Sequence, residues 1–235
     1  MSTTLHELHS HAERSWFEIA PLIDHTLLKP ETTQEQIIQL CEEAARYRFA
    51  CAFVNPTWAA LAVSALAGTG VHVGAPVGFP LGATLATSKR TEALELVRLG
   101  VHDLDMVMNI GALKSGDRNT VLRDIEGVTE IAHDAGAIVK VILETCLLTI
   151  DEKIVACELA ALARADFVKT STGLSTAGAT TDDVALMPGV VGSRAGVKAS
   201  GGIRTVANVL AMIDAGANRI GTSSGVQIVA ELGAR

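Results

Sequence analysis

Three lysines recur at a constant interval in this sequence, each at or near the end of a short apolar run. Lys140, Lys169 and Lys198 are 29 residues apart, about the length of one strand plus one helix. A neutral lysine amine attacks carbonyl carbons and forms Schiff bases. Burial and a neighbouring positive charge both favour the neutral amine. We therefore interpret Lys169 and Lys198 as a pair in which one lysine is a nucleophile and the other lowers its pKa.

Two further charged residues accompany the lysines and allow two interpretations each. Lys140 is a third pocket lysine or, alternatively, a side chain that extends to water or pairs with a carboxylate. Asp105 lies in "DLDMV", where side chains alternate between the two faces of a strand, so that Asp103 and Asp105 share one face. Asp105 is a candidate for moving protons to and from the lysines, and a structural salt bridge to one of them is the alternative.

Glycine-rich stretches follow the last two apolar runs. "ASGGIRT" spans 199–205 and "GTSSG" spans 221–225, and each precedes a helical pattern. Glycine lets the backbone approach a ligand closely, and the amides of a helix N-terminus bind anions. The residues of "KTSTG" that follow Lys169, Thr170 to Gly173, offer further amide and hydroxyl donors. The predicted phosphate contacts are Thr170, Gly173, Gly201, Gly202, Ser223 and Ser224. A Schiff-base lysine beside a phosphate site indicates carbon–carbon bond chemistry on a phosphorylated aldehyde or ketone.

The elements that would position these residues alternate regularly along the chain. Eight short apolar runs, typical of buried parallel strands, are separated by helical patterns. The runs are 22–24, 51–55, 71–77, 104–109, 138–144, 166–170, 197–200 and 219–221. The helical patterns are 33–48, 56–67, 88–99, 119–135, 151–163, 181–187, 205–215 and 223–232. The pattern predicts an α/β fold, a (β/α)8 TIM barrel at 21–235 preceded by a helical extension at 1–20. A doubly wound open sheet is the structural alternative.

Composition excludes several classes of protein. Hydrophobic residues make up 49% of the 235 and charged residues 19%, which is typical of a folded core and not of disorder. A net charge of −7 and 3% aromatic residues give no basis for nucleic-acid binding. No apolar run is long enough for a membrane span, and no signal-peptide pattern opens the sequence. Four scattered cysteines without a CxxC pair indicate reduced thiols, so we expect a cytoplasmic protein.

No cluster of metal ligands is visible in the sequence, so we expect neither a metal nor a cofactor. Three histidines near the start, His6, His9 and His11, have no acidic or cysteine partner at supporting spacing. We interpret them as part of a solvated amphipathic helix.

Eight stretches together resemble the deoxyribose-phosphate aldolase family. They are "IDHTLLKP" at 23–30, "CAFVNP" at 51–56, "VGFPLGA" at 77–83, "DLDMVMNIGALKSGD" at 103–117, "VKVILET" at 139–145, "DFVKTSTG" at 166–173, "VKASGGIRT" at 197–205 and "RIGTSSG" at 219–225. The resemblance implies a class I aldolase that reversibly cleaves 2-deoxy-D-ribose 5-phosphate to acetaldehyde and D-glyceraldehyde 3-phosphate. It implies Lys169 as the Schiff-base lysine, Lys198 as the lysine that lowers its pKa, and Asp105 as the proton carrier.

The resemblance also implies further features of the site. Four residues match pocket positions without a defined role: Asp24, Thr26, Cys51 and Lys140. Some members of the family carry a tyrosine in a C-terminal tail, whereas the only tyrosine here is Tyr47, in a predicted helix. Barrels of this kind often form homodimers or higher homo-oligomers. Two alternatives stay open: a phosphosugar-binding barrel without catalysis, and a Schiff-base aldolase of another substrate range.

Overall fold

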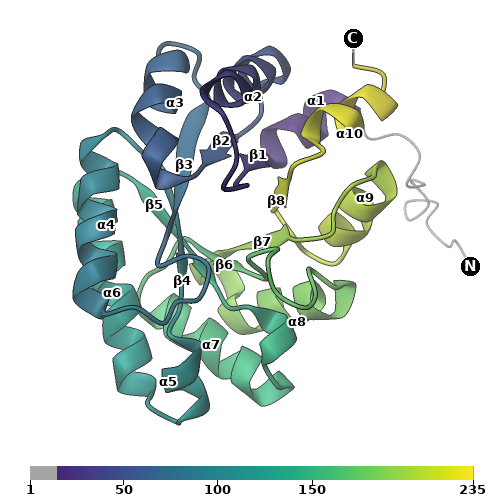
Figure 1. The fold of residues 1–235 in the computed structure, drawn as a ribbon. Coiled ribbons are helices and arrows are strands. Elements are labelled where there is room, and N and C mark those ends of the chain that lie inside the picture. The colour runs from purple at the N-terminus through teal and green to yellow at the C-terminus, as the bar shows by residue number, and fades with distance from the viewer. Residues whose placement is uncertain (1–14, 235) are drawn as a thin grey trace, which may run out of the picture.

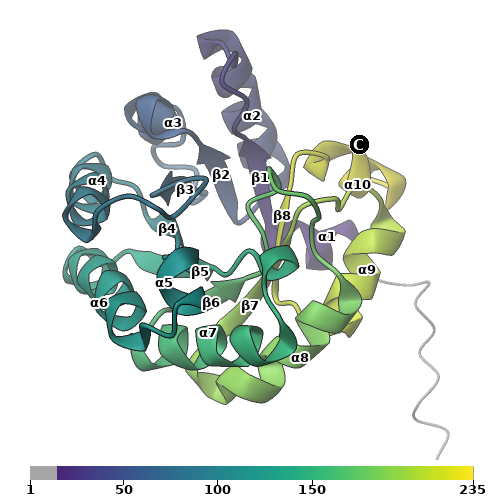
Figure 2. The same ribbon diagram turned by 60° about the horizontal axis from the view of Figure 1, so that its bottom comes forward.

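The chain folds into a closed barrel of parallel strands surrounded by helices. The computed structural model describes residues 15–234. Within that range eight strands pair in sequence order from β1 to β8, and β8 pairs with β1 to close the barrel. The helices form an outer ring around the strands (Figures 1 and 2). The predicted (β/α)8 TIM barrel is confirmed, and the open-sheet alternative is excluded.

The strands and helices alternate along the whole described chain. The strands are β1 (Ile23–Leu27), β2 (Cys51–Val54), β3 (His72–Val77), β4 (Asp103–Val107), β5 (Ile138–Ile142), β6 (Phe167–Lys169), β7 (Gly196–Ser200) and β8 (Arg219–Thr222). The α-helices are α1 (Trp16–Ile19), α2 (Gln34–Tyr47), α3 (Ala59–Ala65), α4 (Ala86–Arg98), α5 (Ile110–Lys114), α6 (Arg118–Asp134), α7 (Ile150–Leu162), α8 (Thr181–Val191), α9 (Val206–Asp214) and α10 (Gly225–Glu231). Short 3-10 helices lie at η1 (Ala20–Leu22), η2 (Pro56–Trp58), η3 (Thr145–Leu147) and η4 (Gly192–Arg194).

Local sequence signals explain where many helices begin and end. Thr33 and Thr149 open α2 and α7 with capping boxes, in which the threonine and a Gln or Glu three residues later bond each other's backbone amides. Gly100, Gly136 and Gly216 follow α4, α6 and α9 with positive φ angles. Glycine adopts this conformation without steric cost, so these three helices end within one residue of the predicted positions.

Several elements differ from the sequence-based expectation, β4 and α8 among them. The run predicted to continue as a strand to Asn109 ends at Val107, and Asn109 instead caps α5 by accepting a hydrogen bond from the amide of Ala112. Helix α8 continues beyond the predicted end through Pro188. A proline removes one helical hydrogen bond, but Met187 and Val191 are buried on either side of it, and their burial offsets that loss.

The apolar core lies between the strands and the outer helices. Val139, Val141, Val168, Val197 and Ile220 point outward from their strands and are at most 2% exposed. Because side chains alternate along a strand, the residues between them point into the barrel. The barrel interior is therefore the place where the charged residues of the strands lie.

The first described residues pack against the barrel. Helix α1 lies beside α10, and Ile19 and Ala20 are buried in the core (Figure 1). His6, His9 and His11, with most of the expected extension at 1–20, lie outside the described residues. Within the described part of the chain, no helix has the combination of length and hydropathy that crossing a membrane requires.

Candidate active site

The inward-pointing side chains form three layers of four, each contributed by alternate strands. This arrangement follows from the register of the eight strand pairs, which shifts by about one residue from each strand to the next. The lower layer is Cys51, Asp103, Phe167 and Arg219; the middle layer is Asp24, Gly74, Lys140 and Lys198; and the upper layer, toward the carboxyl ends of the strands, is Phe53, Asp105, Lys169 and Gly221. Layers of this kind usually hold branched apolar side chains, so the charged residues in this barrel are unusual for the fold.

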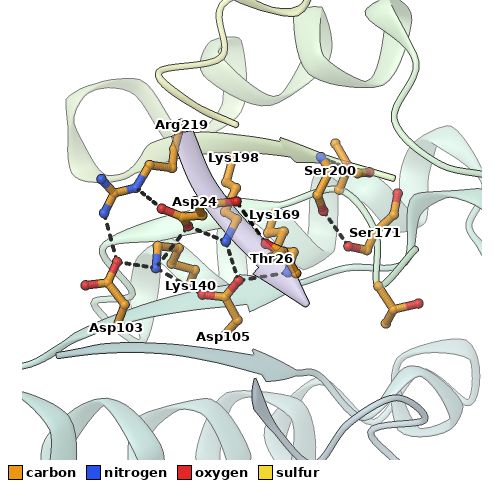
Figure 3. A network of polar contacts seen from close by, with 12 residues as sticks. Asp24, Thr26, Asp103, Asp105, Lys140, Lys169, Ser171, Lys198, Ser200 and Arg219 are labelled. Atoms are coloured by element: carbon orange, nitrogen blue, oxygen red, sulfur yellow. Dashed lines mark hydrogen bonds and ion pairs between the residues drawn. The ribbon is translucent and has the colours of Figure 1, made fainter. Parts of the chain in front are cut away.

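Opposite charges fill most of these positions. Among the described residues of the three layers there are three carboxylates, Asp24, Asp103 and Asp105, and four basic side chains, Lys140, Lys169, Lys198 and Arg219. Figure 3 shows them directed toward one another between the strands. The carboxylates are fully buried, and the three lysines are at most 4% exposed. Buried ions are stable only when they are paired, so three carboxylates can balance three of the four basic groups.

Lys140 is the most completely paired of the lysines. Its Nζ donates to Asp103 Oδ2 at 2.6 Å and to Asp105 Oδ1 at 3.0 Å, and it lies 3.7 Å from Asp24 Oδ2. Burial by itself would lower the pKa of Lys140, but these three carboxylates hold it well above its ordinary value. The structure thus shows the carboxylate-paired alternative for this residue, and Lys140 stays charged.

Lys198 and Arg219 also have two carboxylate partners each. Lys198 Nζ donates to Asp24 Oδ2 at 2.5 Å and to Asp105 Oδ2 at 2.6 Å. Arg219 donates to Asp103 Oδ2 at 2.8 Å, and its Nε lies 3.1 Å from Asp24 Oδ1 without hydrogen-bond alignment. Together with Lys140, these two residues account for the charge of all three carboxylates.

Lys169 is the basic residue that remains. Its Nζ has one carboxylate partner, Asp105 Oδ2 at 2.8 Å, and that same oxygen accepts from Lys198. Burial lowers the pKa of Lys169 to about 8; Asp105 opposes this shift, and the charge of Lys198 reinforces it. At that pKa about one Lys169 in ten is a neutral amine at pH 7.

Asp105 links all three lysines. Burial alone would raise the pKa of Asp105, but the ammonium groups of Lys140, Lys169 and Lys198 hold it well below the usual range. The salt-bridge alternative is therefore present in the structure, and it involves three lysines rather than one. Asp105 is therefore a carboxylate, and its Oδ2 accepts a hydrogen bond from Lys169 Nζ at 2.8 Å.

The remaining pocket candidates lie at different heights in the barrel. Asp24 is in the middle layer. Thr26 lies two residues further along β1, toward the barrel mouth, and its Oγ1 donates to the Asp24 carbonyl at 2.9 Å. Cys51 is in the lower layer, below the level of Lys169. Burial raises the pKa of the Cys51 thiol well above its ordinary value, so the sulfur stays protonated.

Asp24, Cys51 and Asp103 come close enough together to be considered as metal ligands. One ligand atom of each lies within 4.8 Å of the others. The two carboxylates already bind Lys140, Lys198 and Arg219, and the thiol is protonated. These contacts leave the three residues poorly suited to a cation.

The loops after β6, β7 and β8 bring the predicted phosphate residues to one side of the barrel mouth. Gly173, Gly201 and Gly202 have φ angles of 83°, 88° and 80°. A Cβ on Gly201 would lie 2.9 Å from the Cα of Gly178 and 3.4 Å from that of Gly173, so the β6 and β7 loops are in direct contact there. Ser223 is exposed and Ser224 half-buried after β8.

Thr170 differs from the other predicted contacts. Its Oγ1 donates to the Ser200 carbonyl at 3.2 Å and accepts from the Ser200 amide at 3.1 Å, so the hydroxyl joins β6 to β7. The next residue, Ser171, is fully buried, and its Oγ has no hydrogen-bond partner among the described residues. Ser171 was predicted only as one of the donors of "KTSTG" and was not singled out, although alternation along the strand places it on the same side as Lys169.

Glu144 is a second residue that the sequence did not identify as part of the site. It is 3% exposed and adopts a left-handed conformation at φ 56°. Its carboxylate accepts from the amide and hydroxyl of Thr172, and thereby holds the "KTSTG" loop. Nothing in a single sequence predicts this contact between the β5 and β6 loops.

Comparison with known proteins identifies relatives over almost the whole chain. The model of the DeoC/LacD family aldolases matches residues 19–231. A deoxyribose-phosphate aldolase of Thermococcus gammatolerans is 58% identical over 214 residues, which are 90% of this chain and 95% of that one. One of Geobacillus sp. is 56% identical over 211 residues, covering 90% and 94%.

A solved structure agrees with these sequence relatives. The deoxyribose phosphate aldolase of Aeropyrum pernix, described as having a unique tetrameric structure, superimposes with a TM-score of 0.87 at 35% identity and covers 92% of each chain. The fold, the family model and the curated relatives all lead to the same assignment. This chain belongs to the DeoC/LacD family of aldolases.

Proposed function

We propose that this chain reversibly cleaves 2-deoxy-D-ribose 5-phosphate to acetaldehyde and D-glyceraldehyde 3-phosphate through a Schiff base on Lys169, as a step of deoxyribonucleotide catabolism. The observation that carries this proposal is the charge balance of the barrel, in which Lys169 is the one buried lysine without a carboxylate of its own. Relatives named deoxyribose-phosphate aldolase, at 52–58% identity, support the choice of substrate.

The reaction begins at the neutral amine. Lys169 Nζ attacks C1 of the open-chain aldehyde, and the C=O electron pair moves to the oxygen, which takes up a proton from the solvent to give a carbinolamine. Asp105 accepts the proton that the nitrogen loses and returns it, through a water, to the departing hydroxyl. Loss of water leaves a protonated imine, beside which Lys198 Nζ donates to Asp24 and Asp105.

The protonated imine is then the electron sink for cleavage. As the C3 hydroxyl loses its proton, the C2–C3 bond breaks and its electron pair forms the C1–C2 double bond of an enamine. D-glyceraldehyde 3-phosphate leaves at this point. Protonation of the enamine at C2 and addition of water to the imine then release acetaldehyde and regenerate the amine, so the water lost earlier is replaced.

The phosphate of the substrate binds, in this proposal, at the mouth beside Gly173, Gly201 and Gly202. The backbones of Gly173 and Gly201 lie in contact, and Ser223 and Ser224 add hydroxyl donors from the β8 loop. The distance between phosphate and imine then selects a chain of the right length.

The setting of the enzyme is also part of the proposal. We assign catalysis to a domain at 21–235, with 1–20 as an extension, and place the protein in the cytoplasm as a homodimer or higher homo-oligomer. A relative whose solved structure is described as tetrameric supports the oligomer. Nucleic acid and membrane are not expected partners.

Reductive trapping tests the proposed chemistry directly. Incubation with deoxyribose 5-phosphate or acetaldehyde, followed by borohydride and peptide mass mapping, should give a stable adduct on Lys169. Lys169→Ala should give neither adduct nor turnover. An adduct on another lysine would contradict the mechanism, and phosphosugar binding without any adduct would instead support a non-catalytic binding barrel.

A further inference from the structure

The upper layer of the barrel contains one apolar side chain, that of Phe53. This residue is in the interior of β2 and is 1% exposed. Its ring centroid lies 5.3 Å from Lys169 Nζ and 4.7 Å from Lys198 Nζ. The ring is thus the apolar wall of the space around the proposed nucleophile.

The neighbouring strands fit this ring closely. A Cβ on Gly74 of β3 would lie only 2.5 Å from Phe53 Cδ2, so the ring occupies the space that a side chain there would need. On the other side of the layer Gly221 has no side chain at all. Phe53 consequently cannot move toward β3 without a clash, and its distance from Lys169 is set by packing.

This distance constrains what can be bonded to the nitrogen. A carbon attached to the imine carbon lies about 2.5 Å from Nζ. Non-bonded carbon atoms need about 3.5–4 Å between them. A substituent directed at a ring centred 5.3 Å from Nζ therefore overlaps the ring, whereas a hydrogen in that direction does not.

We propose that Phe53 is a specificity-determining residue that selects aldehyde donors over ketone donors at Lys169. An aldehyde places a hydrogen on the imine carbon, and that hydrogen faces the ring. A ketone such as acetone places a second carbon there. The inference rests on the proposed Schiff-base role of Lys169 and adds to it the residue that limits the donor.

The test compares acetone with acetaldehyde as donors, with D-glyceraldehyde 3-phosphate as acceptor. Phe53→Ala should raise the ratio of kcat/KM for acetone to that for acetaldehyde by about tenfold or more, the usual effect of one carbon in an apolar pocket. Phe53→Leu should raise it less. Both ratios are measured relative to the unchanged chain, after circular dichroism has shown that the variants are folded.

Phe167→Ala is the matched control. Phe167 also points into the barrel, but from the lower layer, where its ring lies 5.6 Å from the Arg219 guanidinium. Its truncation should reduce stability without changing the donor ratio. An equal change of ratio in Phe167→Ala would overturn the inference, because general loosening of the barrel would then explain it.

Borohydride trapping separates this inference from the proposed function. If Phe53→Ala traps acetaldehyde on Lys169 and its donor ratio is unchanged, the specificity role is wrong while the aldolase proposal stands. If Phe53→Ala does not fold, Phe53→Leu decides by the same criterion. If the unchanged chain traps no acetaldehyde on Lys169, both proposals fall.

Discussion

At the scale of single residues, Lys169 and Lys198 differ in their number of carboxylate partners. Both lysines follow apolar residues and precede small ones, so they look alike in the sequence. In the barrel, Lys198 bonds Asp24 and Asp105, whereas Lys169 shares Asp105 with two other ammonium groups. With fewer carboxylate contacts to oppose it, burial lowers the pKa of Lys169 to about 8.

Because Lys169 is buried without a carboxylate partner of its own, we expect this residue to lower the free energy of unfolding. The pKa of Lys169 is about 8 in the folded protein and about 10.4 in an unfolded chain. Between these two pKa values the unfolded state binds more protons than the folded state, so the free energy of unfolding increases with pH across this range. Below the range Lys169 is charged in both states, and the full cost of burying its charge lowers the stability of the fold. Lys169→Met should raise the free energy of unfolding at pH 7 by on the order of 3 kcal/mol, and the gain should vanish above pH 10.

Lys140→Met is the control for this measurement. It removes a paired cation and leaves Asp103 and Asp105 short of one partner, which should cost about 3–5 kcal/mol. Urea unfolding at pH 7 and pH 10 compares the two variants. If Lys169→Met and Lys140→Met destabilised the fold equally at pH 7, Lys169 would not be the buried cation that lacks a carboxylate partner of its own.

At the scale of elements, contacts between loops position the site more than the strands themselves do. Strand β6 has only three residues, and its end is held by the bond from Thr170 to Ser200 and by Glu144 on the Thr172 backbone. Behind β4, the buried pair of Lys89 and Asp124 joins α4 to α6, and Lys89 Nζ also donates to the Val107 carbonyl at 2.9 Å. Each of these contacts fixes the carboxyl end of a strand that carries a charged side chain of the site.

The contact between the β6 and β7 loops leads to a prediction for phosphate binding. A Cβ on Gly178 would lie 2.2 Å from the Gly201 carbonyl oxygen, so Gly178→Ala must displace the Gly201 backbone. We expect the KM for D-glyceraldehyde 3-phosphate to rise about tenfold or more, since small displacements of a binding group have effects of this size. The kcat/KM for unphosphorylated D-glyceraldehyde should change much less.

Gly189→Ala provides the comparison in the same region. Gly189 is an exposed residue of α8, and a Cβ there would have no neighbour within 4 Å. Alanine favours the helix, by up to about 1 kcal/mol, and both acceptors should react as before. An equal loss for both acceptors in Gly178→Ala would place the displaced loop away from the phosphate.

At the scale of the whole molecule, the barrel interior makes the fold sensitive to acid. Burial alone would raise the pKa values of Asp103 and Asp105, but Lys140 and its basic neighbours hold both well below the ordinary value near 3.9. A depressed carboxyl pKa contributes stability that is present above the unfolded value and is lost as the pH falls below it. The free energy of unfolding should therefore drop steeply below about pH 4.

Asp103→Asn checks the origin of this slope. The variant should be less stable at pH 7, because Lys140 and Arg219 lose a partner, and its stability should fall less steeply below pH 4. Urea unfolding between pH 7 and pH 2.5 measures both effects. A flat profile below pH 4 in the unchanged chain would contradict the prediction.

Much of the molecule followed from local patterns in the sequence. Alternating apolar runs and helical patterns, with glycines after the helices, were enough to predict the barrel. The spacing of Lys140, Lys169 and Lys198 was enough to predict a lysine site at one end of it. These features are encoded by neighbouring residues, because capping, alternation and glycine conformation act over a few positions.

The tertiary structure alone decided the chemistry of each group. Asp24 and Lys198 are 174 residues apart in the chain, yet they share a hydrogen bond in the middle layer. Such pairs determine which lysine stays charged, why Asp105 remains a carboxylate, and why Phe53 and Gly178 lie where they do. A pKa depends on burial and on charges within a few ångströms, and a donor limit depends on a distance to a ring. Both are set only when the eight strands close into a barrel.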